Sequence, residues 1–437
     1  MRIATLYQHN WLLIRLPIAL LAAGLMTWLW QAFYPMPPTQ LSITTGGAEG
    51  AYYGHARRYA DVFAAHGVTL TIQASAGSQQ NLDRLRQADA PSDLAFVQGG
   101  FGYLGATTDY TSSPRVQTLA NVDVEPLWLF TRWPQLDTLT QLQGLRVAIG
   151  PEGSGTRRVA FKLLEQARIK PTDLTLSPLM GNTAMQALAQ GELDVVLLVA
   201  APQAESVQTA IRLPGVQPVS LRLSAAITER NPYLEARLLT RSAMGQGLPA
   251  RDLTLLTTSA SLVARDELHP ALKRLATAVA MQSHGGGGLF HRAGEFPSLR
   301  QIDFPTAPQS RDVMAHGLNT LEQLLPFWWA QLVERLLLIV LPVSLLALWL
   351  MGQIPTCLRW VLKSRVNRWY GELKFIENDL QHAELPGLDL TRFLQRLNGI
   401  EKALAAFRCP NELMPHCYTL HQHIDFVRRR LYGLRGR

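Results

Sequence analysis

The feature that most constrains this chain is an uncharged apolar run from Leu336 to Ile354, LLLIVLPVSLLALWLMGQI. At about 1.5 Å per helical residue, a run of this length nearly spans the roughly 30 Å hydrocarbon core of a bilayer. A buried core helix is the alternative, but the unbroken length favours a membrane span. We therefore predict a transmembrane helix over residues 332–354.

A second apolar run, Leu16–Trp30, lies near the N-terminus and follows basic residues. A cleaved signal peptide is the alternative. However, no clean small-x-small cleavage motif precedes Pro35, and the aromatic residues at the end of the run are typical of interface anchors. We predict an uncleaved transmembrane anchor over residues 11–33, preceded by a cytoplasmic N-terminus of residues 1–10.

The net charge of +8 resides in the two ends of the chain. Residues after Gly352 hold 14 Lys and Arg against 8 Asp and Glu, and residues before Tyr34 hold two Arg and no acidic residue. By the positive-inside rule, both termini are cytoplasmic and a middle of roughly 300 residues is exported. The expected location is the inner (cytoplasmic) membrane, with the main domain periplasmic. Topology and anionic membrane lipid explain the basic ends, so we expect no nucleic-acid partner.

All three cysteines, Cys357, Cys409 and Cys417, lie in the predicted cytoplasmic tail, residues 358–437. The exported segment has none, which fits a reducing compartment for the tail and excludes a disulfide-built scaffold.

The tail shows helical periodicity. Helices are expected over Leu358–Glu384, Leu390–Phe407 and Tyr418–Leu431, with a break at Pro386-Gly387. A solvated helical hairpin and a docking or signalling module both fit this pattern.

The exported middle alternates apolar strands with amphipathic helices, which predicts parallel pairing in a doubly wound α/β sheet. The expected strands are Leu41–Thr45, Val68–Ser75, Ser92–Gln98, Leu145–Gly150 and Asp194–Ala200, with extended segments over Val116–Arg132, Val216–Leu221 and Asp252–Arg265. A helix is expected over Pro270–His284, after the last of these segments. The run Val116–Arg132 is long enough to leave one unit and enter another, and Val216–Leu221 is expected to return the chain. The predicted domains are a first lobe over 41–125, a second lobe over 126–220, and the rest of the first lobe with a linker over 221–326.

Four turns follow predicted strands. They are GGAEGAYY (Gly46–Tyr53), AGSQQN (Ala76–Asn81), VQGG (Val97–Gly100) and GPEGSGT (Gly150–Thr156). Glycine allows the main chain to approach a ligand, and the unpaired N–H groups of a helix N-terminus bind anions. Helix capping alone explains any single turn, whereas four turns at one sheet edge favour a carboxylate site that needs no metal.

Enzyme motifs are incomplete. GPEGSGT lacks the lysine of a phosphate loop and does not form the G-x-S-x-G elbow. A hydrolase that uses Ser78 or Ser154 stays as a third reading, although neither serine has a recognisable base in the sequence.

Metal-binding spacing is also missing, and we expect no metal, no cofactor and no enzymatic activity. The residues considered were Asp61, Asp93, Asp123 and Glu192, expected as caps or surface residues; His284 and His291 beside a GGGG run, expected in a loop; and a loose tail group of Cys409, His416, Cys417, His421 and His423.

Several segments, in order, resemble the TAXI-type solute-binding proteins of tripartite ATP-independent periplasmic (TRAP) transporters. They are GGAEGAYYGHARRYA, SAGSQQNLDRLRQADAPSDLAFVQ, RVAIGPEGSGTRRVA and MGNTAMQALAQGELDVVLLVAAPQ, and the resemblance covers about Leu41 to Phe304. HGGGGLFHRAGEFPS and the apolar tail resemble the membrane-anchored branch of that family. The resemblance implies a two-lobed type II periplasmic-binding-protein fold, flanked here by two transmembrane helices and a helical C-terminal tail. It also implies a small organic acid or amino acid as ligand and a TRAP-type transporter membrane subunit as partner.

By position, the resemblance also gives the residues expected to hold the ligand. They are Gly46, Gly47, Tyr52, Ser78, Asn81 and Gln98 in the first lobe, and Ser154, Gly155, Thr156, Asn182 and Pro202 in the second. Arg157 and Arg158 either steer an acid or form a solvated helix face. Soluble relatives lack the two anchors, so a tethered sensor that signals through its tail is the alternative function.

Overall fold

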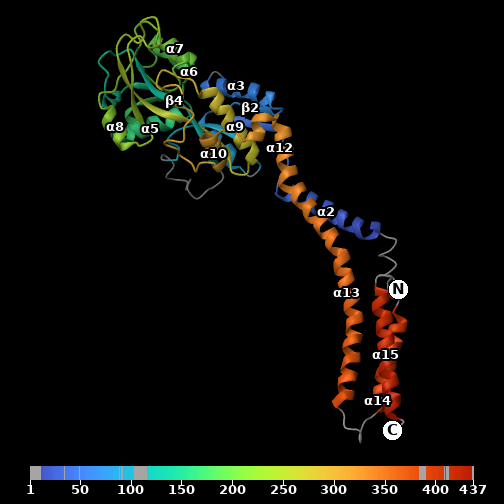
Figure 1. Cartoon of the computed structure of the whole chain (residues 1–437). Coiled ribbons are helices and arrows are strands. Elements are labelled where there is room, and N and C mark those ends of the chain that lie inside the picture. Colours follow the sequence, from blue (N-terminus) through green and yellow to red (C-terminus); the bar gives the residue numbers. More distant parts are fainter. Residues whose placement is uncertain are drawn as a thin grey trace. The chain divides into compact units, whose positions relative to one another are not determined.

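The computed structural model describes residues 11–33, 35–48, 50–87, 89, 92–102, 116–382, 390–407, 409 and 413–435. The chain divides into two compact units, which we call the sheet unit (Met36–Leu332) and the helical unit (Met1–Pro35 with Val333–Arg437). Figure 1 colours the chain from its N-terminus to its C-terminus. The predicted cytoplasmic N-terminus, residues 1–10, and the predicted break at Pro386-Gly387 lie outside the described residues.

The sheet unit contains one continuous sheet in the order β2-β1-β3-β10-β4-β7-β5-β6, with β8 paired to β4 and β9 paired to β10. The strands are β1 (Gln40–Thr44), β2 (Thr69–Gln73), β3 (Leu94–Gln98), β4 (Val116–Thr131), β5 (Arg146–Ala148), β6 (Thr175–Ser177), β7 (Val195–Val199), β8 (Gln217–Pro218), β9 (Glu235–Leu239) and β10 (Leu253–Arg265). Pairs β1–β2, β1–β3, β5–β6 and β5–β7 are parallel, as the strand–helix pattern predicts.

Helices connect and cover these strands. They are α3 (Ala51–Ala65), α4 (Ser78–Arg86), α5 (Gly155–Gln166), α6 (Gly181–Gln190), α7 (Glu205–Ala210), α8 (Ser224–Arg230), α9 (Pro270–His284), α10 (Pro308–His316), α11 (Thr320–Leu324) and α12 (Phe327–Arg335), with 3-10 turns at Leu139–Leu142 and Pro171–Asp173. α9 has the predicted bounds. Its first residue, Pro270, has the backbone angle of a helix start, and the His269 side chain accepts a hydrogen bond from the Ala271 N–H.

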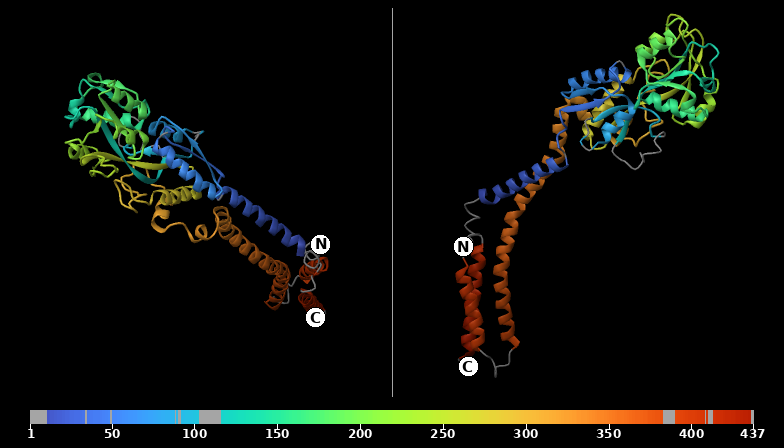
Figure 2. Two further views of the ribbon diagram at one scale, coloured as in Figure 1. Left: turned by 90° about the horizontal axis from the view of Figure 1, so that it is seen from above. Right: turned by 180° about the vertical axis from the view of Figure 1, so that it is seen from behind.

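Two long antiparallel strands, β4 and β10, join the two lobes. They pair from Leu127 and Leu256 to Val116 and Arg265. The C-terminal half of β10 also pairs with β3 of the first lobe, and the C-terminal half of β4 also pairs with β7 of the second lobe. The two lobes connected by these strands are visible in Figure 1 and, from behind, in Figure 2. The sheet unit therefore has the expected two-lobed fold of the type II periplasmic-binding-protein kind.

Each lobe has its own buried core. The first-lobe core joins β1 and β3 to α3 and α9 through fully buried side chains that include Ile43, Tyr59 and Phe63. The second lobe has apolar layers on both faces of its sheet, one around Leu163 and one around Trp128.

The return of the chain to the first lobe differs from the expectation. Val216–Leu221 was expected to cross, but β8 pairs with the second-lobe end of β4. Residues from Leu221 to Leu256, including Tyr233 and Leu239, belong to the second-lobe cores. The return crossing lies within β10, which pairs with β9 of the second lobe in its first half and with β3 of the first lobe in its second half.

The helical unit contains α2 (Trp11–Phe33), a π-helical turn (Leu336–Val340), α13 (Leu341–His382), α14 (Leu390–Ala406) and α15 (Met414–Arg435). Two segments are long and apolar enough to cross a membrane, Leu16–Phe33 and Phe327–Gln353. Only 6% of each is buried, whereas a core helix of a soluble protein would be mostly buried. α13 continues without interruption past residue 354, so the predicted span and the first tail helix are one helix.

The tail forms a packed bundle. The C-terminal half of α13 lies against α14 and α15, and Figure 2 shows α14 and α15 side by side from two directions. Fully buried side chains such as Ile376, Leu397 and Leu420 form its core. A solvated helical hairpin, one of the two expectations, therefore does not describe the tail, because its three helices share a buried core. A disulfide joins Cys409 and Cys417, which differs from the expectation of reduced thiols and arises because the ends of α14 and α15 bring the two residues together.

The carboxyl group of Asp303 offers a stability test of the first lobe. It accepts a hydrogen bond of 2.7 Å from the Gly100 N–H, and burial raises its pKa from 3.8 to about 6. Because the folded-state pKa lies above the unfolded value, ionisation destabilises the fold as pH rises from about 4 to above 6. The full effect is on the order of 2–3 kcal/mol.

We predict that Asp303→Asn, which keeps an acceptor oxygen but has no charge, gains stability relative to the native chain as pH rises. The difference in unfolding free energy should grow by about 2 kcal/mol between pH 4.5 and pH 7. Urea unfolding of both full chains in detergent, followed by tryptophan fluorescence, measures this difference. A difference that does not change with pH would rule out a buried titrating carboxyl at this position.

Candidate functional site

A cavity of about 410 Å³ is lined by residues from both lobes. Nine of the eleven residues expected from the sequence line it: Gly46, Gly47, Tyr52, Ser78, Gln98, Ser154, Gly155, Thr156 and Asn182. They come from the turns and helix starts that follow β1, β2 and β5, from the last residue of β3 and from the start of α6. The turns meet because the carboxyl ends of parallel strands point to one edge of each sheet.

The other two expected residues, Asn81 and Pro202, do not line the cavity. The Asn81 side chain is fully buried; it accepts a hydrogen bond of 2.7 Å from the Thr44 hydroxyl and donates one of 2.8 Å to the Phe96 carbonyl. This amide therefore holds the ends of β1 and β3 together. The Pro202 carbonyl accepts a hydrogen bond of 2.8 Å from the Gln208 side chain.

The N-termini of α4 and α5 both reach the cavity. Ser154 caps α5 by accepting a hydrogen bond of 3.2 Å from the Arg157 N–H, so the N–H groups of Gly155 and Thr156 have no intrahelical acceptor. The Thr156 hydroxyl accepts a hydrogen bond from the Val199 N–H at 3.0 Å, which fixes the start of α5 on β7. Such helix starts attract anions through their N–H groups and the helix dipole.

Gly155 packs closely against the side chain of Gln98. A Cβ atom at Gly155 would lie 2.2 Å from Gln98 Oε1 and 3.0 Å from its Cδ, so a larger residue at this position would displace the amide. Gln98 is 4% exposed, and its Nε2 atom has no partner among the described residues. The same is true of Asn182 Oδ1 on the other side of the cavity. Buried polar atoms are normally hydrogen-bonded, so these two are available to a ligand.

A buried carboxyl group that sequence reasoning missed completes the lining. Glu125 on β4 is 6% exposed and accepts a hydrogen bond of 2.7 Å from the Tyr52 hydroxyl. Burial raises the pKa of Glu125 to about 8, and burial together with Glu125 raises the pKa of Tyr52. The available signal was a pair of acidic residues, Asp123 and Glu125, in the middle of the crossing strand.

The ionisable side chains of the lining are carboxyl groups, of which Glu125 is mostly protonated at neutral pH because burial raises its pKa to about 8. Glu125 and Glu205 line the cavity, and no basic side chain occurs among the described lining residues. Electrostatic attraction for an anion at this site therefore comes from main-chain N–H groups and not from a cationic side chain.

The two lobes touch at one edge of the cavity. The Gln79 N–H of α4 lies 3.4 Å from the Gly153 carbonyl, and Arg158 Nη1 donates a hydrogen bond of 2.6 Å to Gln79 Oε1. The Arg158 guanidinium also lies 4.5 Å from the ring centroid of Phe101. Gly77, with φ of +135°, permits this approach, because a Cβ atom there would lie 3.1 Å from Ser154 Cα.

These contacts show what the side chains of Arg157 and Arg158 bind. Arg158 joins the lobes, whereas Arg157 stays within the second lobe, with Nη1 3.2 Å from the Gly150 carbonyl. Neither lines the cavity, so direct clamping of an acid, one of the two expectations, does not describe this structure.

We predict that Arg158→Ala shifts the sheet unit toward a wider separation of the lobes. The lost charged hydrogen bond contributes on the order of 1–3 kcal/mol to the closed arrangement. Pulsed electron paramagnetic resonance measures this shift between spin labels at Gln87 and Lys170 in a Cys357→Ser background. Arg157→Ala is the matched control and should leave the distances unchanged; equal distances in all three proteins would contradict the assignment.

Comparison with known protein families identifies one match. Residues 43–272 match the sequence model described as NMT1-like family. No curated protein matches the chain.

Similar solved structures include two sulfonate-binding proteins. The periplasmic aliphatic sulphonate binding protein SsuA of Escherichia coli is 17% identical, with a TM-score of 0.36 over 57% of this chain and 69% of that one. The alkanesulfonate-binding protein SsuA of Xanthomonas axonopodis pv. citri, bound to MOPS, is 16% identical, with a TM-score of 0.35 over 57% and 74%. An ancestral arginine-binding protein bound to arginine is 12% identical, with a TM-score of 0.37 over 57% and 95%.

Proposed function

The chain belongs to the NMT1-like family, and from this premise we propose that it is a membrane-anchored extracytoplasmic receptor for a small organic acid or amino acid. The observation that carries the proposal is the cavity lined by the N-termini of two helices, α4 of the first lobe and α5 of the second. Closure of the lobes would trap the ligand without chemistry. The two apolar helices and the charge distribution support attachment to the membrane with both termini cytoplasmic.

The charge of the lining favours an amino acid over a dicarboxylate. A second carboxylate would meet Glu125 and Glu205 with no cationic side chain among the described lining residues to balance it. An ammonium group beside Glu125 would lower the raised pKa of this carboxyl group and form a charge-assisted hydrogen bond with the carboxylate, while the ligand carboxylate takes the N–H groups of α5. We therefore propose a zwitterionic amino acid as the ligand.

The partner proposed for the receptor is a TRAP-type transporter membrane subunit. The support for this partner is the TAXI-type sequence resemblance, which is finer than the family match. The free energy for transport would come from the ion gradient of that transporter and not from this chain.

The direct test is to identify the small molecule that the full chain carries. Native mass spectrometry of the chain purified in detergent should detect an amino acid that dissociates on activation. Calorimetry of the ligand-free chain should then give one site for that amino acid and weaker binding of dicarboxylates. A folded chain that produces no heat with a broad panel of amino acids and organic acids would end the receptor proposal.

Two hydroxyl groups should contribute to affinity. We predict that Ser78→Ala and Thr156→Ala each weaken binding of the amino acid by about 1–2 kcal/mol, because each hydroxyl can donate to the ligand and also accepts a backbone N–H. Thr156→Ser keeps the hydroxyl and serves as the control. Calorimetry of the folded variants checks this, and native affinity in both alanine variants would move the ligand elsewhere.

Glu125→Gln distinguishes the ligand classes. The substitution keeps the shape of the side chain but removes the capacity to bear negative charge. We predict at least a roughly tenfold loss for an amino acid and little change for its deaminated keto acid, which lacks the ammonium group. Equal losses for both molecules would show that Glu125 does not contact an ammonium group.

A sensor is the second candidate, because α13 runs unbroken from the candidate membrane span into the three-helix core of the tail. A rigid helix can carry a displacement across the membrane. Truncation after Gln353 separates the two functions: loss of a downstream response with uptake intact supports a sensor, and loss of uptake with the response intact supports a receptor alone.

A further inference from the structure

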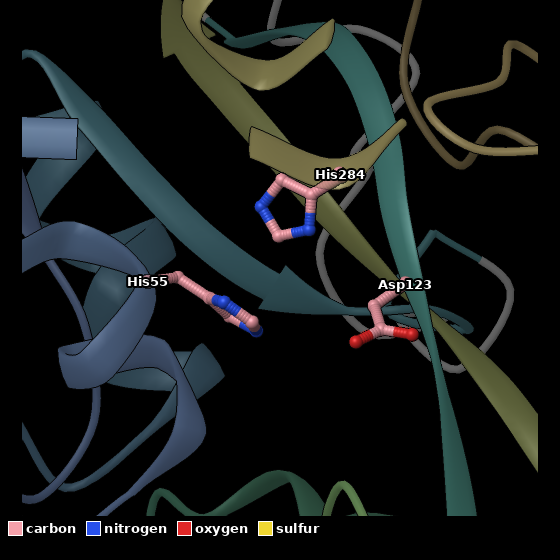
Figure 3. A group of neighbouring side chains, drawn as sticks. All are labelled: His55, Asp123 and His284. Carbon is pink, nitrogen blue, oxygen red and sulfur yellow. The ribbon is translucent and has the colours of Figure 1, made fainter. Parts of the chain in front are cut away.

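A second cluster of side chains lies beside the proposed ligand cavity. His55 of α3, Asp123 of β4 and His284, the last residue of α9, each place one potential ligand atom within 4.8 Å of the others. Figure 3 shows the two imidazole rings and the carboxylate directed into one common space. Together with His291, they line an adjoining cavity of about 550 Å³, which shares Gly50, Ala51, Ala204 and Glu205 with the ligand cavity. From the sequence, Asp123 was expected as a cap or surface residue and His284 in a loop, whereas His284 is the last residue of α9.

We propose that His55, Asp123 and His284 form a binding site for a divalent transition-metal ion of the Zn²⁺ type. Two imidazoles and one carboxylate are a donor set that suits such ions better than Ca²⁺ or Mg²⁺, which prefer oxygen ligands. Three protein ligands leave at least one coordination position open toward the cavity, as in exchangeable zinc sites.

The burial of the two histidines supports a ligand at this point. His55 and His284 are each 8% exposed, and their ring centroids lie 4.7 Å apart. The His284 Nε2 atom is buried and has no hydrogen-bond partner among the described residues. A buried imidazole nitrogen without a partner is unusual, and coordination to an ion would satisfy it.

The surroundings of Asp123 position its carboxylate. The Val124 N–H donates to Asp123 Oδ1 at 2.7 Å, and His291 Nε2 lies 3.4 Å from the same oxygen. Both contacts are made to Oδ1, which leaves Oδ2 for the ion. His291 is a positioning residue in this arrangement, because second-shell partners orient the carboxylates that bind metals.

Arg58 opposes metal binding in the present arrangement. Its Nη2 atom lies 2.5 Å from His55 Nδ1, and arginine can only donate, so Nδ1 is the acceptor. An ion at Nδ1 would displace the arginine directly. An ion at Nε2 would require the ring proton on Nδ1, which also breaks the contact. Because the Arg58 side chain is exposed on α3, it can swing into solvent when the ion binds.

The ion would tie together elements that also build the ligand cavity. α3 supplies His55 to the metal cluster and Tyr52 to the cavity, and β4 supplies Asp123 and Glu125 in the same way. Bound metal would fix α3 against β4 and α9, which stabilises the first lobe.

The test uses the full chain in detergent, stripped with chelator and titrated with Zn²⁺ alone, in a His421→Gln background. That background removes a second group of possible ligands in the tail, Glu401, His421 and Asp425. We expect one bound Zn²⁺ by calorimetry and elemental analysis, and a higher melting temperature with Zn²⁺. Absence of saturable binding up to about 100 µM Zn²⁺ would overturn the proposal, since such a Kd corresponds to only about 5.5 kcal/mol.

Isosteric variants locate the ion. Asp123→Asn and His284→Gln should each weaken Zn²⁺ binding at least roughly tenfold, whereas His316→Gln on the exposed face of α10 should bind as the parent does. Co²⁺ substitution gives a second readout, because loss of one ligand changes the visible absorption spectrum. Unchanged affinity and spectrum in both ligand variants would place the ion elsewhere and refute the site.

Arg58→Gln gives a result that misfolding cannot imitate. It removes the competing donor and supplies an acceptor for the His55 Nδ1 proton, so Zn²⁺ affinity should rise about tenfold. Native or reduced affinity in a variant that melts normally would contradict the role given to Arg58 and, with it, coordination by His55.

Discussion

The antiparallel pairing of β4 with β10 is the constraint on which the sheet unit depends. These two strands belong to both lobes, so every residue near their midpoint lies where the lobes meet. Glu125 and Asp123 occupy that region of β4, and each faces a different cavity. The pairing is irregular there, with register shifts at Ala260/Ser261 and Leu262/Val263. Bulges of this kind redirect side chains and increase local twist, which suits a segment that connects two separately packed cores.

The proposed ligand site follows from the same geometry. Parallel strands on both sides of the crossing deliver their carboxyl ends, and the helices that start there, to one space. The lining is short of charge: main-chain N–H groups and two unpartnered amide atoms face two carboxyl groups. Such a cavity would reject a ligand whose charged group finds no partner in it. A buried charge without a partner destabilises the complex far more than a missing contact does.

Local features of the sequence predicted most of the fold. The strands of the first lobe and helix α9 were found because short apolar runs, glycine turns and a helix-starting proline are local signals. β9 was missed, since its sequence EARLL mixes charged residues with leucine and its stability comes from pairing with β10. The return of the chain to the first lobe was misplaced for the same reason. The lobe to which a segment belongs depends on the strands it pairs with, and these lie far away in sequence.

In the candidate site too, residues with local sequence signals were predicted and residues that depend on long-range packing were not. Nine of the residues that line the cavity were predicted from the sequence, because each glycine turn at a strand end can be recognised by itself. Asn81 could not be distinguished from a ligand residue, since its buried contacts to Thr44 and Phe96 depend on strand packing. The cluster of His55, Asp123 and His284 had no sequence spacing to reveal it, because three separate elements bring it together.

Hydrogen exchange of main-chain amides tests the central claim most directly. We propose that N–H groups at the starts of α4 and α5, which belong to opposite lobes, bind one small molecule together. In the full chain, the released ligand should slow exchange in peptides covering residues 77–81 and 153–158 together, and removal of the ligand should reverse both effects. Ligand binding that protects only one of these segments, or neither, would contradict it.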